Sequence, residues 1–337
     1  MFLAFGTAIF KPGVQGLIAN QMPPGAASLG WGLFYQMVNI GGFIGPLVAG
    51  YLRVLEWEYV FLVCAAGITL NFIPLFFFKD PSRPESSDSE TTNPLSMLYE
   101  AVHGLLEPRL FFFTISFAGF WLMFYQLFDI LPNFINDWID SRAAAQALEG
   151  FFGAGNIPLT TSGNLTQEWI INFNALLISF MAFAMGYLTG KMKSLHAIIL
   201  GIGVSAFGIY ALGMDMSGYW ILGAIALFSM GEMAASPTKM RYLASIAPPG
   251  REGLYMGYAN FTVGIGASLG GVLAGHLYQE QGDEVVLARR YLVEKSLATK
   301  SEVAAISKDD LLPFFEKTVG VDAWETRKLL WEQYEPY

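Results

Sequence analysis

The stretch GTAIFKPGVQGLIANQMPPGAASLGWG (residues 6–32) has a counterpart 225 residues later, GEMAASPTKMRYLASIAPPGREGLYMG (residues 231–257). The 47 residues that begin at Gly6 align without a gap on those that begin at Gly231, and fifteen of the aligned positions are identical. The identical positions include a Pro-Pro-Gly turn and a series of glycines. This internal repeat predicts two copies of one structural unit in the same orientation.

Composition places both copies in a membrane. The chain has 337 residues, of which 54% are hydrophobic and 14% charged, whereas a soluble domain has about 25% charged residues. The single Cys64 excludes an internal disulfide and a cysteine metal cluster. The formal net charge of −9 comes from loops and the tail, and no segment is basic enough to predict a nucleic-acid surface.

Eight apolar stretches have about the 20 residues that a helix needs to cross a bilayer. They cover residues 1–20, 29–52, 59–78, 110–132, 169–190, 196–214, 217–243 and 253–278. The sequence therefore predicts an all-α, polytopic membrane protein. A linker of Pro, Ser and acidic residues follows the third stretch and ends in a short amphipathic segment near Met97–Leu106.

The basic residues of the short loops predict the orientation of these helices. If the linker is cytoplasmic, eight Lys and Arg residues lie on the cytoplasmic side and two, Arg53 and Arg142, lie on the other. The eight are Lys79, Arg83, Arg109, Lys191, Lys193, Lys239, Arg241 and Arg251. We therefore expect a multi-pass protein of the bacterial inner membrane with a cytoplasmic linker, and an outer loop over residues 133–168.

The repeat maps the first helix on the seventh and the second on the eighth, so each copy has six helices. Parallel six-helix halves are the arrangement of the major facilitator fold. By this count the chain is a fragment that holds about helices 4–11 of 12 and is truncated at both ends. The expected domains are residues 1–78 from the first half, a cytoplasmic linker at 79–109, residues 110–279 from the second half, and an extramembrane helical segment at 280–337 before a missing last helix.

The tail segment is polar and carries two helix-start patterns, SKDD (307–310) and DAWE (322–325). We expect two or three short amphipathic helices there.

We single out three ionisable residues of the predicted membrane helices as functional candidates, because a charge within the membrane costs at least about 2.5–3.5 kcal/mol. They are Lys11, Asp129 and Glu232. The repeat places Lys11 and Glu232 on equivalent helix faces, so both should point toward the central axis and could bind the two ends of a zwitterion. The alternative is an ion pair that holds the halves together. Asp129 could equally reach the membrane interface.

Small residues and prolines predict close packing and bending. Gly41 and Gly45, with Gly266 and Gly270, form small-residue stripes that let helices approach each other. Pro12 and Pro237 interrupt the helix hydrogen bonds beside the charged residues. The same features are common in any large helix bundle.

Several motifs resemble the proton-dependent oligopeptide transporter family. They are GTAIFKP (6–12), FYQMVNIGG (34–42), GEMAASP (231–237) and IAPPGREGLYMG (246–257), while GYLTGKMK (186–193) resembles a loop motif of the facilitator superfamily. The resemblance covers residues 1 to about 279. It implies proton-driven symport of di- and tripeptides by alternating access.

The resemblance also implies roles for individual residues. Lys11 would bind the peptide carboxylate, Glu232 with Ser236 the amino group, and Asn39 and Asn174 the peptide backbone. Tyr35, Tyr125 and Gln126 would line the pathway. Where the family commonly has a proton-coupling Glu, this chain has Tyr125. Asp129 or Glu232 would then carry the proton, or the coupling differs, or the substrate is not a peptide.

The sequence thus predicts a secondary transporter, not an enzyme, most simply a proton-coupled symporter of peptides or related zwitterions. A transporter of another organic anion or metabolite, and a non-transporting receptor or scaffold with the same fold, stay open. No GxxxxGK[ST] motif is present, so ATP-driven transport is disfavoured. We expect no cofactor or metal beyond the proton gradient, and a monomer whose partners are its substrate and the lipid bilayer.

Overall fold

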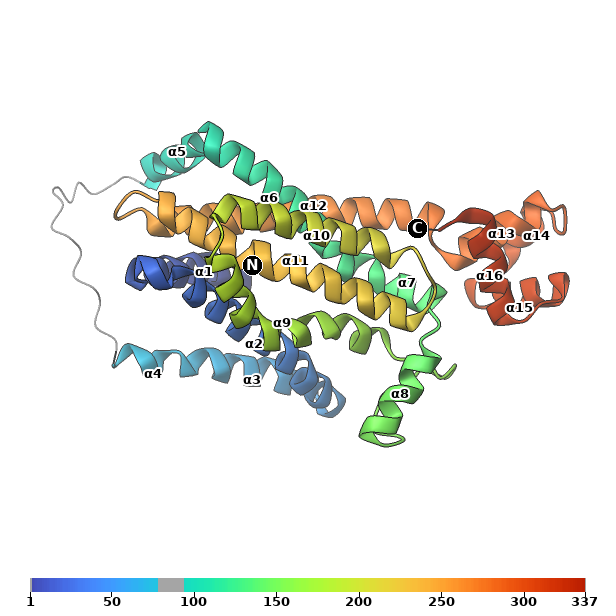
Figure 1. Ribbon diagram of the computed structural model, residues 1–337. Helices are drawn as coiled ribbons and strands as arrows, with labels where there is room; N and C mark the ends of the chain where they lie inside the picture. Colours follow the sequence, from blue (N-terminus) through green and yellow to red (C-terminus); the bar gives the residue numbers. More distant parts are fainter. Residues whose placement is uncertain (1, 78–93, 337) are drawn as a thin grey trace. The chain divides into compact units, whose positions relative to one another are not determined.

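The computed structural model describes residues 2–77 and 94–336 (Figure 1). Lys79 and Arg83, which were counted in the predicted linker, lie outside these residues. The described chain is helical apart from short loops and two isolated β-bridges. The longer helices are α1 (Phe2–Gln21), α2 (Ala27–Leu55), α3 (Trp57–Leu70), α6 (Pro108–Asp129), α9 (Gln167–Gly190), α10 (Ser194–Leu212), α11 (Gly218–Ile246) and α12 (Glu252–Gln281).

Shorter helices connect and follow the long ones. They are the 3₁₀ turn η1 (Pro24–Ala26), α4 (Phe72–Leu75), α5 (Pro94–Gly104), α7 (Leu131–Trp138), α8 (Arg142–Phe152), α13 (Glu284–Glu294), α14 (Lys300–Ala305), α15 (Lys308–Val319) and α16 (Ala323–Tyr334). The predicted outer loop at 133–168 therefore contains helical structure. The tail contains four helices, so the prediction of two or three was wrong.

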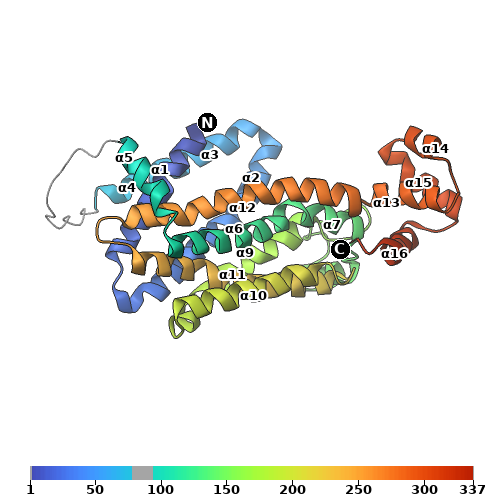
Figure 2. The same cartoon turned by 90° about the horizontal axis from the view of Figure 1, so that it is seen from above.

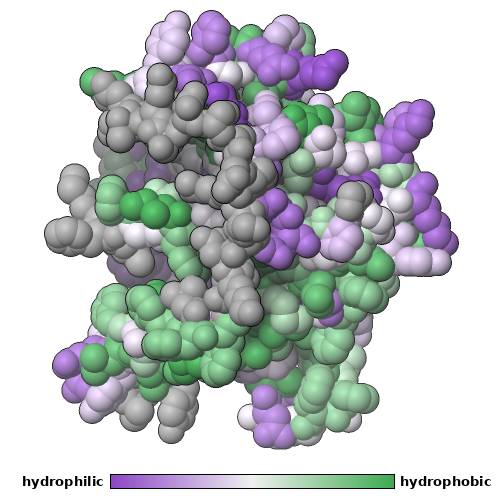
Figure 3. Space-filling view, turned by 90° about the vertical axis from the view of Figure 1, so that its left-hand side faces the viewer, coloured by the Kyte–Doolittle hydropathy of each residue, from purple (hydrophilic) through white to green (hydrophobic). Residues whose placement is uncertain are grey.

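Six segments of the described residues are long and apolar enough to cross a membrane. They are Trp57–Pro74, Pro108–Asp129, Gln167–Gly190, Ser194–Leu212, Gly218–Ile246 and Glu252–Glu294. The two remaining predicted spans are helical as α1 and α2. Large apolar side chains such as Phe180 and Val272 are 76% and 74% exposed, as expected of surfaces that face lipid. Hydrophobic side chains also gather over the lower part of the face in Figure 3.

Helix ends follow from local chemistry. α6 ends at Asp129, and α7 begins at Leu131 with Pro132 in its first turn. A proline lacks the amide hydrogen that a helix interior needs but is tolerated in the first turn. Ser307 accepts a hydrogen bond from the amide of Asp310 at the start of α15. Asp322 and Glu325 form a capping box at the start of α16. The two helix starts predicted in the tail are therefore confirmed.

The chain divides into two compact units. The first unit comprises residues 1–115, 174–202 and 229–261, and the second comprises 116–173, 203–228 and 262–337. α6, α9, α10, α11 and α12 each contribute residues to both.

Close helix contacts organise the first unit. A Cβ on Gly32 would lie 3.2 Å from the Cα of Gly186, so α2 and α9 approach closely there. The Ser28 hydroxyl donates to the carbonyl of Gly186 at 2.6 Å and fixes the same crossing. A Cβ on Gly16 of α1 would lie 2.8 Å from the Cα of Gly253 of α12. These contacts bring α2 against α9 and α1 against α12.

The second unit has the larger apolar core. It includes Leu127, Trp138, Phe228 and Leu287, all fully or almost fully buried. α13 to α16 pack together in the tail, as Figures 1 and 2 both show. The Trp138 indole donates to the carbonyl of Gly282 at 2.8 Å and connects α7 to the start of the tail.

Asp137 adds a polar contact beside this connection. Its carboxylate accepts a hydrogen bond from the Tyr278 hydroxyl at 2.7 Å. Burial raises the pKa of Asp137, and the hydrogen bond from Tyr278 offsets part of that rise.

Candidate functional site

α11 carries two charged side chains that are buried in the first unit. Glu232 is 1% exposed and Lys239 is 5% exposed. They lie seven residues apart, with the buried Ser236 between them, so all three share one face of the helix. Charged groups at this depth are rare unless they are paired or functional.

The carboxylate of Glu232 is held by side chains from two other helices. Tyr35 of α2 donates its hydroxyl hydrogen bond to Oε1. Asn174 of α9 donates its amide to Oε2 at 2.8 Å and lies 2.9 Å from the hydroxyl of Ser229. Charge-assisted hydrogen bonds of this kind are what stabilises a buried carboxylate. One acidic group therefore connects α2, α9 and α11.

The packing of α2 against α9 explains how Tyr35 reaches this carboxylate. Gln36 follows Tyr35 in α2, and its side-chain amide donates to the carbonyl of Ser179 in α9 at 2.6 Å. The side-chain amide of Asn39 donates to the carbonyl of Tyr35, within its own helix, at 2.9 Å. The buried hydroxyl of Ser236 lies close to the Tyr35 hydroxyl.

Lys239 was missed by the sequence analysis. It was counted on the cytoplasmic side because it lies near the end of the predicted span with Arg241; the structure buries its side chain in α11, which continues to Ile246. Lys239 interacts electrostatically with both Glu232 and Lys11. The spacing of seven residues after Glu232, on the same helix face, was the signal that could have identified it.

Lys11 lies on α1, which contains Pro12, and its side chain is exposed. The described residues show no contact between Lys11 and Glu232. The first unit therefore brings Tyr35, Asn174 and Glu232 into direct contact, with Ser236 and Lys239 beside them and Lys11 further out. Pro237 lies within α11 next to this group.

Tyr125, Gln126 and Asp129 of α6 belong to the second unit. Asp129 is exposed and interacts electrostatically with Tyr125. Gln126 donates its amide to the carbonyl of Leu122 at 2.7 Å.

The predicted glycine contacts differ between the two copies of the repeat. Gly266 and Gly270 of α12 lie against α6, where a Cβ would come 2.5 Å from Trp121 and 2.9 Å from Gln126. No described atom lies within 4 Å of where a Cβ would stand on Gly41 or Gly45. Close packing at Gly41 and Gly45 therefore stays a prediction.

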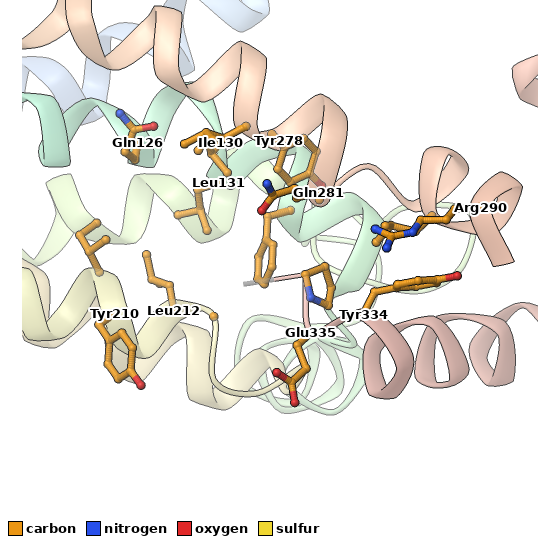
Figure 4. A pocket seen from close by; sticks show the side chains of 17 residues that line it. Gln126, Ile130, Leu131, Tyr210, Leu212, Tyr278, Gln281, Arg290, Tyr334 and Glu335 are labelled. Atoms are coloured by element: carbon orange, nitrogen blue, oxygen red, sulfur yellow. The ribbon is translucent and has the colours of Figure 1, made fainter. Parts of the chain in front are cut away.

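The second unit also contains a cavity of about 610 Å³ (Figure 4). Its walls are mostly apolar side chains of α6, α7, α10 and α12, including Ile130, Leu131 and Leu212. Arg290 and Glu335, from the tail, also line the cavity; Figure 4 shows Arg290 at the right and Glu335 at the lower centre. This cavity does not include Glu232. We place the candidate site at Glu232 because its buried carboxylate accepts hydrogen bonds from side chains of two other helices within the same unit.

Chemically, the Glu232 group can exchange a proton or hold a cationic group. An ionised carboxylate accepts both hydrogen bonds, whereas a protonated one becomes a donor on one oxygen. Within the described residues, no group of three or more His, Cys, Asp or Glu is arranged to hold a metal ion.

Comparison with known proteins agrees with this architecture. The family model described as Major Facilitator Superfamily matches residues 1–160 and 143–286. The chain is similar to the multidrug resistance protein MdtH of Photorhabdus laumondii, with 22% identity over 82% of this chain and 62% of that protein. MdtH of Salmonella paratyphi B is 23% identical over 81% of this chain and 61% of its own length, so the chain spans about three fifths of these relatives. Its helical membrane architecture and its match to the family model identify the chain as a member of the major facilitator superfamily.

Proposed function

We propose that this transporter is proton-coupled and that Glu232 carries the proton. The observation that supports this role most directly is the 1% exposure of the Glu232 carboxylate on a membrane helix, with hydrogen bonds from two other helices. A buried carboxylate in a membrane protein is a candidate for a proton relay.

Protonation of Glu232 would change the contact between α2 and α11. While Glu232 is ionised, Tyr35 donates to Oε1. A proton on Oε1 makes the carboxyl the donor, and the Tyr35 hydroxyl must then accept or turn away. Asn174 can continue to donate to Oε2 in either state. The protonation state of Glu232 thereby favours one arrangement of these helices over another, which alternating access requires.

For the substrate we propose a small organic solute with an ionised amine, which the carboxylate of Glu232 can bind in exchange for its proton. One candidate is a peptide or related zwitterion in symport. Lys11 would bind its carboxylate, Glu232 and Ser236 its amino group, and Asn39 and Asn174 its backbone. The motif resemblance and the electrostatic interactions of Lys239 with Glu232 and with Lys11 favour this candidate.

The other candidate is export of lipophilic amines. The names of the relatives, multidrug resistance protein MdtH, favour it. An exporter of amines needs the carboxylate of Glu232 but has no use for Lys11 as a carboxylate-binding group.

The test is transport by the protein in liposomes with an imposed proton gradient. We expect Glu232→Gln to abolish gradient-driven movement, because an amide cannot exchange a proton, and Glu168→Gln, at an exposed acid of α9, to leave it unchanged. Gradient-driven transport at the parental rate in Glu232→Gln would refute the role of Glu232.

The substrate is tested in the same liposomes with labelled dipeptides and with a lipophilic amine dye. Symport of zwitterions predicts dipeptide accumulation and a raised KM in Lys11→Ala. Export predicts dye movement that Lys11→Ala does not affect.

A further inference from the structure

The linker helix α5 is fastened to the beginning of α12 within the first unit. The Tyr258 hydroxyl donates to the carbonyl of Ala101 at 3.1 Å. Arg251 forms an ion pair with Glu100 at 3.1 Å. Gly104 contacts the Tyr258 hydroxyl so closely that a side chain there would collide with it.

A cavity of about 230 Å³ lies between these two elements. Aromatic rings from both sides line it. Tyr99 and His103 of α5 stack with centroids 5.8 Å apart, and Tyr255 and Tyr258 of α12 meet edge to face at 5.6 Å. This volume is below the roughly 300 Å³ at which drug-sized pockets begin, so it fits only a small ligand.

The charges of the lining favour a cation. Three charged residues line the cavity, and two of them, Glu100 and Arg251, neutralise each other. The third, Glu107, has no ion-pair partner among the described residues and interacts electrostatically with the Tyr255 and Tyr258 hydroxyls. One uncompensated carboxylate therefore stands beside several aromatic rings.

We propose that this cavity binds a small organic cation of the trimethylammonium type. The aromatic rings offer their electron-rich faces to the methyl groups, and Glu107 supplies the counter-charge. The site is separate from Glu232 and does not rest on the proposed transport function. An occupied site would hold α5 against α12 more firmly, because the ligand contacts both.

The test uses choline and its uncharged isostere 3,3-dimethylbutan-1-ol, each titrated into the purified full chain in maltoside detergent. Saturation-transfer NMR of the ligand methyl groups reports binding. We expect choline to bind and the isostere to bind at least about fivefold more weakly, because only the cation gains from the rings and the carboxylate. Equal affinity for the two compounds overturns the proposal.

Three variants locate the site. Glu107→Gln and Tyr255→Leu should each weaken choline binding about two- to fivefold. Glu58→Gln, at an exposed acid of α3, should leave it unchanged. Glu107 is exposed, so Glu107→Gln should keep the unfolding temperature of the parent and remain informative even if Tyr255→Leu does not fold.

Binding that is unaffected by Glu107→Gln refutes the assignment. Binding that is lost in Glu232→Gln but kept in Glu107→Gln would place the cation at the buried cluster and would also refute it.

Discussion

Tyr35 and Asn174 supply the two direct hydrogen bonds that hold the carboxylate of Glu232. A hydrogen bond to a charged group contributes about 1.5–3 kcal/mol. We therefore expect Tyr35→Phe to lower the free energy of unfolding at pH 8 by about that amount and to slow transport. Thermal unfolding of the purified protein and transport in liposomes measure the two effects.

Tyr187→Phe is the matched control for this substitution, because Tyr187 is 54% exposed on α9. If the two variants behave alike, the hydrogen bond from Tyr35 has no part in holding Glu232.

For individual residues, the sequence predicted which side chains belong to the site better than it predicted which of them are in contact. Glu232 and Asn174 are recognisable as polar residues within apolar stretches, and their contact needs only the two helices to be neighbours. To predict whether Lys11 and Glu232 act together, one must know how their two long side chains are oriented. An alignment of the repeat gives no information about side-chain orientation. Lys239 was overlooked because basic residues near a helix end are normally assigned to the membrane interface.

Two glycines of α10 allow a sharp test of helix packing. A Cβ added to Gly201 would lie 2.6 Å from the carbonyl oxygen of Gly231 and 2.7 Å from the amide nitrogen of Ala235. A Cβ added to Gly203 would have no described atom within 4 Å. We expect Gly201→Ala to destabilise the protein by about 1–3 kcal/mol, because backbone must move to make room. Gly203→Ala should be neutral or stabilising by up to about 1 kcal/mol, since alanine is the better helix former.

Thermal unfolding of the two variants under identical detergent conditions measures the difference. Equal unfolding temperatures would mean that α10 and α11 are not packed as described around Gly231.

Most of the long helices could be predicted because apolar length alone determines a membrane span. The tail was predicted less completely, although the signals were present. Thr299 and Glu302 form a capping box at the start of α14, and Asp283 caps α13. The start of α14 follows the pattern that identified α15 and α16, whereas α13 has Val286, not an acid, at its third position. The helices within residues 133–168 are short and lack such patterns, so their existence depends on packing in the second unit.

The orientation of the whole molecule in the membrane is a prediction that labelling can check. Cys64 is the only cysteine, so Cys64→Ser gives a background without thiols. In that background a membrane-impermeant maleimide added to intact cells should label Ala304→Cys in the tail and leave Lys193→Cys, between α9 and α10, unlabelled until the cells are opened. Both positions are exposed. The reverse pattern would invert the proposed topology.

The placement of Glu232 and Lys239 on a single helix links the site to the membrane voltage. With Glu232 ionised and Lys239 protonated the pair has no formal charge, and a proton on Glu232 leaves it with a charge of +1. Moving one elementary charge through the full membrane potential is worth about 2.3 kcal/mol per 100 mV. A carrier built on this helix would therefore respond to the electrical part of the proton gradient in its proton-loaded form, and only to the chemical part when the pair is neutral.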